Sequence, residues 1–397
     1  MDPSREVVVL SAVRTPIGKY GGSLKDFSPT DLGAAVVRES IKRAAIDPKE
    51  VGHVVFGNVI HTEAKDMYLS RVVAIGGGVP VEAPALTVNR LCGSGLQAIL
   101  SASQAILLGD ADVAVAGGVE SMSRAQYWLG GLRWGQRMNN ATAVDVMVGA
   151  LTDPFDEVHM GITAENIARK WGISREDQDA LAAESHRRAI NAVEQCRFKD
   201  QILPIELKTK DGVVMFETDE GPRSDATLEK LAKLKPVFDK AGTVTAGNAS
   251  TINDGAAAVV LMEKNAAAEH GLKPMGRLID YTVSGVEPRH MGIGPVPAVR
   301  KLLQKTGLTI DNVDIFEVNE AFAAQALAVV RDLHLPSDRT NPNGSGISLG
   351  HPIGATGAVL TVKALYELHR TGGRYAVVTM CIGGGQGIAA LFEALYH

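Results

Sequence analysis

One cysteine of this sequence, Cys92, lies between segments that predict a strand and a helix. Residues 85–88 predict a short buried strand, and an apolar helical rhythm begins at Leu96. Gly93 and Gly95 let another molecule approach the backbone closely. Free N–H groups and the helix dipole favour an anion there, so we expect the Cys92 thiolate to form more easily than that of a free cysteine. A small buried structural cysteine at a packed helix start explains this stretch equally well.

Two further glycine-rich turns carry reactive side chains, His351 and Cys381. The first precedes an expected helix over 358–369, and the second follows an expected strand over 375–379. A cysteine and a histidine suffice to make a thiolate nucleophile. A second cysteine, in a loop that presents backbone N–H groups, adds an acid/base and an oxyanion site. The three turns therefore predict nucleophilic catalysis, provided that the fold brings them together.

The elements that must position these turns occur in a repeated order. Residues 50–58 resemble residues 311–319, and residues 111–118 resemble residues 374–384. Valine-rich strands alternate with amphipathic helices, which is typical of an α/β protein with buried sheets. We interpret the pattern as an internal duplication of βα-layered units, although any two α/β segments look loosely alike. A pseudo-twofold pair of sheets would gather the turns at strand ends.

The expected elements divide the chain into three units. Residues 1–120 with 247–270 form a first half, residues 121–246 an inserted domain, and residues 271–397 a second half. The insertion is too long and too amphipathic for a disordered linker, and its clearest helix covers 175–193. The other expected elements are strands over 7–13, 51–60, 256–262 and 313–318, a helix over 31–45 with Asp31 as its N-cap, and a helix over 299–307.

The composition restricts the possible partners and compartment. The chain has 397 residues with 45% hydrophobic and 21% charged side chains, ordinary values for a globular protein. A net charge of −5 argues against nucleic acid or an anionic membrane as the main partner. Its three cysteines form neither a disulfide framework nor a zinc motif, so we expect no metal and a reducing compartment. With no leader segment and no apolar run near the length of a membrane span, we expect a cytoplasmic protein.

Four blocks around these turns resemble the signature blocks of the thiolase family, and the likeness runs from Arg14 to the C-terminus. The blocks are Asn89-Arg90-Leu91-Cys92-Gly93-Ser94-Gly95, Asn319-Glu320-Ala321-Phe322, Asn341-Pro342-Asn343-Gly344-Ser345-Gly346 with Gly350-His351-Pro352-Ile353-Gly354, and Cys381-Ile382-Gly383-Gly384-Gly385-Gln386-Gly387. Four separate motifs in this order are highly specific.

The resemblance implies a fold, a reaction and roles for five residues. The fold has two duplicated βαβαβαββ halves packed as a five-layer αβαβα core with an inserted loop domain. The reaction is a reversible Claisen condensation or thiolysis of coenzyme A thioesters, with no cofactor beyond these substrates. Cys92 would carry the acyl group, His351 would deprotonate it, and Cys381 would move the proton at C2 of acetyl-CoA. His351 with a water held by Asn319 would form one oxyanion hole, and the N–H groups of Cys92 and Gly383 the other.

The resemblance also places coenzyme A, acetyl-CoA and 3-ketoacyl-CoA against a set of binding residues, and it implies a homotetramer built as a pair of dimers. The implied binding residues are Leu151, His159, Met160, Arg223, Ala246, Ser250, Met291, Ala321 and Phe322. By residue type alone, Met160 and Met291 fit core filling as well as ligand contact. The sequence departs from the family pattern at Gln126, where proline is usual, and at Thr251, where glycine is usual.

Chain length and rival functions stay open at this point. Residues 159–161 look like short-chain biosynthetic thiolases, and residues 66–71 look like thiolases that accept longer 3-ketoacyl groups. We expect a short-chain enzyme with acetoacetyl-CoA activity; the alternative is a longer-chain degradative thiolase of β-oxidation. A ketoacyl synthase would pair its cysteine with two histidines, and Cys381 counts against that. A nucleotide-binding oxidoreductase lacks its G-x-G-x-x-G here, because Ile388 takes the last position. A non-catalytic relative would not be expected to keep all the reactive residues.

Overall fold

The structure, a computed structural model, describes residues 5–210 and 212–396. The expected domain ranges reach residues 1–4, 211 and 397, which lie outside the described part. Nine strands of the main sheet follow the order β12-β13-β14-β11-β1-β10-β5-β3-β4, with β2 (Gly18–Lys19) paired to β10. The strands are β1 (Val7–Arg14), β3 (His53–Gly57), β4 (Ala85–Val88), β5 (Val113–Ser121), β10 (Asn253–Glu263), β11 (Gly276–Gly285), β12 (Ile315–Val318), β13 (Tyr375–Ile382) and β14 (Gln386–Ala394).

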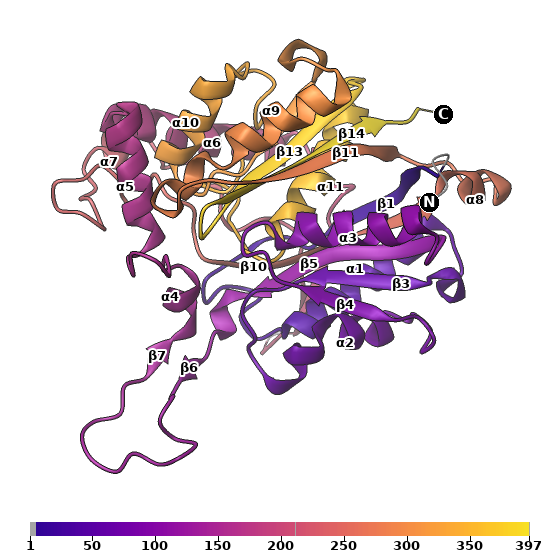
Figure 1. Cartoon of the computed structure of the whole chain (residues 1–397), viewed down its shortest axis with the longest axis horizontal. Coiled ribbons are helices and arrows are strands. Elements are labelled where there is room, and N and C mark those ends of the chain that lie inside the picture. Colours follow the sequence, from indigo (N-terminus) through magenta and orange to yellow (C-terminus); the bar gives the residue numbers. More distant parts are fainter. Residues whose placement is uncertain (1–4, 211, 397) are drawn as a thin grey trace.

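Helices make three layers that alternate with the two halves of this sheet (Figure 1). Helices α3 (Ser94–Leu108) and α11 (Thr356–Thr371) pack together between the halves in one shared core. Helices α1 (Pro29–Ala44) and α2 (Leu69–Gly76) cover the outer face of the first half, as α9 (Pro295–Thr306) and α10 (Ala323–Leu333) cover the second. The expected five-layer order is therefore present.

The expected duplication is visible in the strand pairing. In the first half β3 runs parallel to β5, which is antiparallel to β10; in the second half β12 runs parallel to β13, which is antiparallel to β14. The two halves join where β1 pairs with β11 through Val7–Val9 and Gly276–Leu278. The N-terminal strand β1 therefore lies in the middle of the sheet, between β10 and β11.

Two expectations about local structure were wrong. The N-cap of α1 is Ser28, whose hydroxyl accepts the N–H of Asp31, because Pro29 suits the first helical position and starts the helix earlier. Strand β4 is not buried: it forms the edge of the sheet, and Leu86 is 46% exposed. A single edge pairing leaves one side of such a strand uncovered.

Other element boundaries moved by a few residues from the expected ranges. Strand β3 is shorter than 51–60, because the Val51 N–H still closes the 3-10 helix Pro48–Glu50 and the N–H groups of Val59 and Ile60 bind the Glu120 carboxylate. Strand β12 is also shorter than expected, whereas α9, α11 and β10 start earlier. Helix α3, within Leu91–Leu108, is long and apolar enough to cross a membrane, but it is mostly buried in the core.

The segment between β5 and β10 consists of helices and two small hairpins, and part of it packs against the cores of the two halves. Its helices are α4 (Val146–Ala150), α5 (Met160–Trp171), α6 (Arg175–Glu194) and α7 (Leu228–Leu231), and its hairpins are β6 (Tyr127–Trp128) with β7 (Val144–Asp145) and β8 (Ile205–Thr209) with β9 (Gly212–Phe216). Helix α8 (Lys264–Glu269) follows β10. The loop between β6 and β7 extends away from the body (Figure 1) and exposes Leu132, Trp134 and Met138.

Candidate active site

Cys92 lies in the turn between β4 and α3, next to the first helical residues. The turn is tight: Leu91 has a φ of 43°, and Gly93 precedes the first helical residue, Ser94. The Cys92 side chain is buried among apolar groups that include Ile60, Met122, Val146 and Ile353. Sequence reasoning placed this cysteine correctly at a strand-to-helix turn.

The expectation of an easily formed thiolate was wrong for the resting protein. Burial raises the pKa of Cys92 to about 11, although backbone N–H groups of Gly383 and of Cys92 itself lower it. The negative charge of Glu120 adds to the rise. Desolvation in an apolar pocket thus outweighs the helix start. Cys92 rests as a thiol and needs a base at the moment of attack.

His351 is built to be that base. Its Nδ1 lies 2.6 Å from Oγ1 of Thr356, whose own hydroxyl hydrogen donates to the Pro352 carbonyl at 2.9 Å. Thr356 Oγ1 therefore accepts the Nδ1–H hydrogen, so Nε2 carries no hydrogen and its lone pair can take up a proton. Nε2 faces the Nδ2 amide of Asn319 at 3.4 Å. Burial lowers the pKa of His351 to about 4, so the ring is neutral at pH 7.

The backbone around His351 is fixed by Asn253. The Oδ1 atom of Asn253 accepts the His351 N–H at 2.9 Å. Gly350 has a φ of 113°, and a Cβ there would lie 2.5 Å from the Asn253 amide, so only glycine fits. Thr251, one of the departures from the family pattern, donates its hydroxyl to the same Asn253 oxygen at 2.8 Å. The departure therefore touches the support of the histidine rather than a reactive atom.

Cys381 lies within β13, one residue before its end, because the strand continues beyond the expected 375–379 to Ile382. It is fully buried in a cluster with Met160, Met291, Ala321 and Phe322. Burial raises its pKa well above the ordinary value, and the charge of Cys92 raises it further. The turn that carries Cys92 touches the end of β13, since a Cβ on Gly93 would lie 2.8 Å from Cδ1 of Ile382. Three of the implied binding residues, Met160, Met291 and Ala321, pack here behind Cys381.

Gly383 lies against the end of the Met160 side chain. Its backbone N–H lowers the pKa of the Cys92 thiol, and a Cβ at this position would lie 2.2 Å from Cε of Met160. The glycine lets the backbone approach the nucleophile. The arrangement can direct two N–H groups, from Cys92 and Gly383, at a thioester oxygen during attack.

An open cavity of about 530 Å³ leads to His351 from the surface of the inserted segment. It brings together six of the implied binding residues, namely Leu151, His159, Arg223, Ala246, Ser250 and Phe322. His159 also caps α5 by accepting the Gly161 N–H, and its ring stacks on Phe238 with 4.5 Å between centroids. Lys19 and Arg223 put positive charge in the wall.

Sequence reasoning missed several residues of this cavity. Phe238 stands edge-on to Phe322, with 6.2 Å between centroids, and completes an aromatic wall. Lys19 and Tyr20 come from the first half, far away in the sequence. The lone aromatic in the polar stretch 233–242 is the one signal that could have pointed to Phe238.

A buried carboxylate, Glu120, also escaped the sequence analysis. Its two oxygens accept the N–H groups of Val59 (3.1 Å), Ile60 (3.0 Å) and Gly354 (2.8 Å), as well as Nδ2 of Asn58 (3.0 Å). Burial raises the pKa of Glu120 to about 8 despite these donors. Glu120 thus ties the wall around Cys92 to the loop that carries His351.

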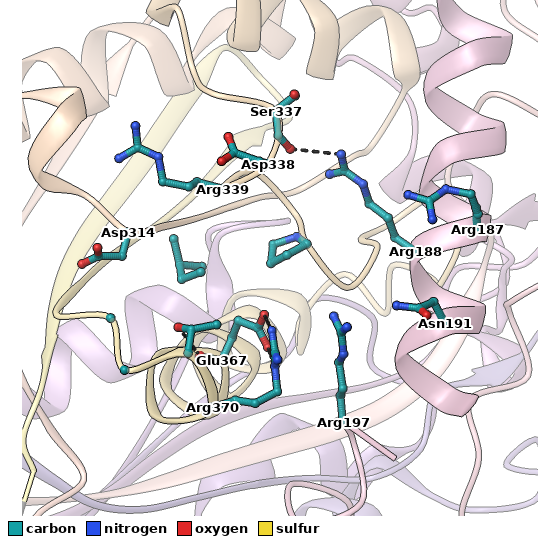
Figure 2. Close-up of a pocket in the computed structure, with 15 residues that line it drawn as sticks. Arg187, Arg188, Asn191, Arg197, Asp314, Ser337, Asp338, Arg339, Glu367 and Arg370 are labelled. Carbon is teal, nitrogen blue, oxygen red and sulfur yellow. Dashed lines mark hydrogen bonds and ion pairs between the residues drawn. The ribbon is translucent and has the colours of Figure 1, made fainter. Parts of the chain in front are cut away.

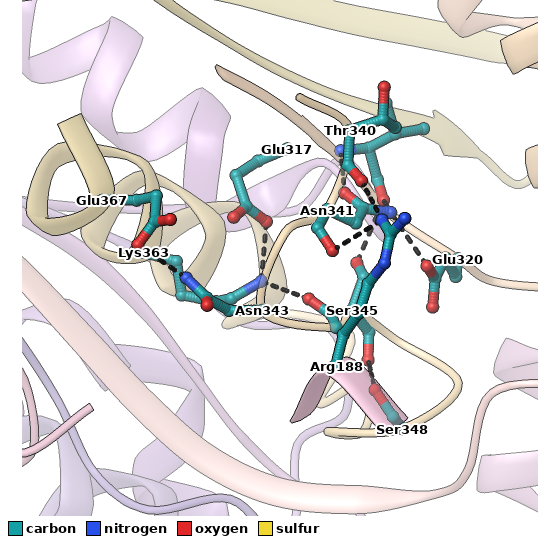
Figure 3. A network of polar contacts seen from close by, with 12 residues as sticks. Arg188, Glu317, Glu320, Thr340, Asn341, Asn343, Ser345, Ser348, Lys363 and Glu367 are labelled. Carbon is teal, nitrogen blue, oxygen red and sulfur yellow. Dashed lines mark hydrogen bonds and ion pairs between the residues drawn. The ribbon is translucent and has the colours of Figure 1, made fainter. Parts of the chain in front are cut away.

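The strand that presents Asn319 is held by a buried polar network (Figure 3). Asn341 accepts the Val318 N–H at 2.8 Å and donates to the Val318 carbonyl and to Glu320. On the same strand, the Glu317 carboxylate binds the ammonium of Lys363 at 2.7 Å, with both side chains buried. Asn319 itself is fully buried.

Comparison with known proteins identifies the family. Residues 7–265 match the family "Thiolase, N-terminal domain", and residues 272–394 match "Thiolase, C-terminal domain". The chain belongs to the thiolase family. This thiolase is 62% identical over 393 residues to "Beta-ketothiolase BktB" of Cupriavidus necator, covering 99% of this chain and all of that protein. It is 49% identical to "Acetyl-CoA acetyltransferase" of Syntrophomonas wolfei, at 99% and 100% coverage.

A solved structure supports the same conclusion. Human mitochondrial 3-ketoacyl-CoA thiolase in complex with CoA superposes with a TM-score of 0.96 at 45% identity, over 99% of this chain and 98% of that one. The sequence resemblance and the expected fold class are confirmed. A nucleotide-binding oxidoreductase is excluded by the family, and the thiolase matches leave the ketoacyl synthase without support.

Two smaller points concern Gln126, the other departure from the family pattern, and the expectation that no metal is bound. Gln126 is exposed, donates to the Arg124 carbonyl at 3.0 Å and lines a neighbouring hollow near Leu91. Residues 5–210 and 212–396 contain no group of three or more His, Cys, Asp or Glu side chains placed to hold a metal ion.

Proposed function

We propose that this thiolase catalyses the reversible condensation of two acetyl-CoA to acetoacetyl-CoA and CoA, and the thiolysis of short-chain 3-ketoacyl-CoA. The observation that carries the proposal is the convergence of Cys92, neutral His351 with Asn319, and Cys381 beside a cavity rich in implied CoA-binding residues. A coenzyme A complex of a close structural neighbour supports the choice of substrate.

In the first half-reaction Cys92 takes the acyl group. Since the pKa of Cys92 is about 11 and that of His351 about 4, a free thiolate–imidazolium pair is unfavourable in the resting site. We infer that the proton moves from Cys92 to Nε2 of His351 as the sulfur attacks the thioester carbonyl. The N–H groups of Cys92 and Gly383 stabilise the oxyanion. Its collapse expels the CoA sulfur, which takes the proton back from His351.

In the second half-reaction Cys381 acts at carbon. Cys381 first passes its proton to Nε2 of His351 and, as the thiolate, removes a proton from C2 of a second acetyl-CoA, while the Nε2–H of His351 and an Asn319-held water donate to the enolate oxygen. The carbanion then attacks the acetyl group on Cys92, forming the carbon–carbon bond and releasing the Cys92 sulfur, which takes the proton from Nε2 of His351. Thiolysis is the reverse sequence, with Cys381 returning the proton to C2.

The cavity is suited to the pantetheine arm and nucleotide of CoA. Apolar and aromatic groups line its inner part: Leu151, Ala246, Phe322 and Phe238. Arg223, 55% exposed and 3.2 Å from Asp225, stands at the nucleotide end together with Lys19. Met160, Met291 and Ala321 surround Cys381 and limit the space for the acyl group.

The preference for short acyl groups is the finer part of the proposal. The relatives named above include beta-ketothiolase and acetyl-CoA acetyltransferase, as well as a mitochondrial 3-ketoacyl-CoA thiolase. Buried Met160, Met291 and Phe322 around Cys381 favour the shorter acyl group. Thiolysis rates measured with 3-ketoacyl-CoA of four to ten carbons test this, and a maximum above six carbons would establish the longer-chain alternative.

We further propose a cytoplasmic homotetramer that needs no cofactor. Exposed Leu132, Trp134 and Met138 on the long β6–β7 loop supply apolar surface for assembly. Sedimentation at micromolar concentration should show a species of four 41.9 kDa chains, and a lone monomer would exclude this assembly.

Incubation of the purified protein with acetoacetyl-CoA and free CoA, with no added cofactor, should consume thioester. Absence of turnover, or dependence on a nicotinamide, would overturn the proposed reaction.

A further inference from the structure

A second cavity, of about 710 Å³, shares no lining residue with the first. Its walls come from α6, the loop over 337–342, the start of β12 and the end of α11 (Figure 2). This cavity lies at the beginning of β12, whereas Asn319 follows the end of that strand. Arginines dominate the charged groups of its lining, which are Arg187, Arg188, Arg197, Arg339, Arg370, Asp314, Asp338 and Glu367.

Three of these guanidinium groups are fixed mainly by neutral oxygens. Arg188 donates to the carbonyls of Thr340 (2.5 Å) and Ser337 (3.0 Å) in addition to Glu184. Arg197 donates to the side-chain oxygens of Asn343 (2.8 Å) and Gln195 (3.0 Å). Arg339 donates to the Val313 carbonyl at 2.8 Å and meets the exposed Asp311 carboxylate only at 3.9 Å. Neutral oxygens orient a guanidinium but leave its positive charge in place.

Two of the three carboxylates in the lining are already engaged, and the third, Asp338, is exposed. Glu367 accepts two bonds from Arg370 and one from Asn343, and Asp314 accepts two backbone N–H groups. Glu184, just outside the lining, serves both Arg187 and Arg188, which lower its pKa to about 2. The lining itself carries five cations against three anions. An anion entering this cavity therefore meets oriented positive charge.

We propose that this arginine-lined cavity binds a small anion with two linked phosphate groups. Arginine forks match phosphate oxygens in pairs, and cations on α6 and on α11 can each face one phosphate. The volume is that of a small-molecule site rather than of a single ion. Arg188 and Asn343 belong to the contacts that hold the loop over 340–350, which leads to His351 (Figures 2 and 3). The bound anion should therefore stabilise the folded protein.

The test uses the full chain and inorganic pyrophosphate as the probe. Calorimetric titration and thermal unfolding, at constant ionic strength and with saturating CoA to occupy the first cavity, should show saturable binding and a raised Tm. Arg197→Gln and Arg370→Gln should each weaken binding by about tenfold or more. Arg331→Gln removes an arginine on α10 that is as exposed as Arg370 and is paired with Asp177 away from the cavity, and this variant should bind like the wild type.

Two further arms keep the result interpretable. Arg197→Lys keeps the charge and should retain more affinity than Arg197→Gln, even if the glutamine variant is less stable. Replacing pyrophosphate with ADP shows whether the diphosphate alone is recognised or a nucleotide adds contacts. No binding by the wild type up to about 1 mM would overturn the proposal. So would binding that CoA abolishes and that Arg197→Gln and Arg370→Gln leave unchanged.

Discussion

The two halves of this thiolase place an asparagine at the same point of the fold and use it differently. Asn58 directly follows β3, and Asn319 directly follows β12, the matching strand of the other half. The amide of Asn58 donates to the Val119 carbonyl and to Glu120, both at 3.0 Å. The amide of Asn319 instead faces Nε2 of His351. One asparagine ties the backbone together, whereas the other faces the reactive centre.

The difference lies in what each asparagine faces. In the first half the buried carboxylate of Glu120 takes up the amide and the neighbouring N–H groups. In the second half the amide points at a neutral imidazole. Among the described residues neither the Asn58 Oδ1 nor the Asn319 Oδ1 has a hydrogen-bond partner, so the difference lies in the amide nitrogens. Duplication supplied two equivalent positions, and a single acidic neighbour made one of them structural.

The largest expected effect comes from removing the nucleophile. Cys92→Ala should reduce thiolysis of acetoacetyl-CoA by about 10⁴-fold or more, because no acyl-enzyme can form. Incubation of the wild type with acetyl-CoA should leave an acetyl mass on the Cys92 peptide. Cys196→Ser changes the exposed cysteine that lies outside the site, and this variant should keep its activity. Label found mainly on Cys381 or Cys196 would falsify the assignment.

The next effect separates the two site cysteines by half-reaction. Cys381→Ala should keep exchange of labelled CoA into acetyl-CoA but lose deuterium uptake at the acetyl methyl group, because only the latter needs a proton moved at C2. His351→Ala should impair both. If deuterium uptake survives while CoA exchange is lost, the two roles are reversed.

The asparagine pair tests the comparison directly. Asn319→Ala should lower kcat by roughly 10²- to 10³-fold with little change in stability, because it removes a donor from the oxyanion site. Asn58→Ala should lower the free energy of unfolding by about 1–3 kcal/mol, since Glu120 and the Val119 carbonyl lose a buried donor. Its kcat should stay within about tenfold of the wild type. Equal kcat losses in two stably folded variants would contradict the division of roles.

The smallest effect is a pH dependence of stability. The pKa of His351 is lowered from its ordinary 6.5 to about 4 in the folded protein, so folding excludes a proton that the unfolded chain binds. This contribution is fully present above pH 6.5 and is lost as the pH falls toward 4. The wild type should lose about 2 kcal/mol between pH 7 and pH 5 through this group. Unfolding of His351→Gln should show a shallower acid dependence, and parallel curves would show that His351 does not contribute.

The sequence predicts those features that depend on contiguous residues. The glycine-rich stretches next to Cys92, His351 and Cys381 indicated the reactive groups, and the repeated blocks indicated the duplicated fold. The sequence does not predict features that depend on residues far apart in the chain. The high pKa of Cys92 arises from Ile60, Met122 and Ile353, which no local pattern connects to it. Glu120 carried no signal, because its four donors come from two distant segments, residues 58–60 and Gly354.

The central place of β1 bears on how the protein is made. The N-terminal strand leaves the ribosome first, yet its partners are β10, which begins at Asn253, and β11, which begins at Gly276. At usual rates of translation, the chain grows for roughly 10 to 50 s before the first of them is complete. For that time an apolar strand lacks both neighbours in the sheet. Synthesis in cells should therefore depend on holding chaperones, and slower growth of the chain should increase aggregation of the nascent protein.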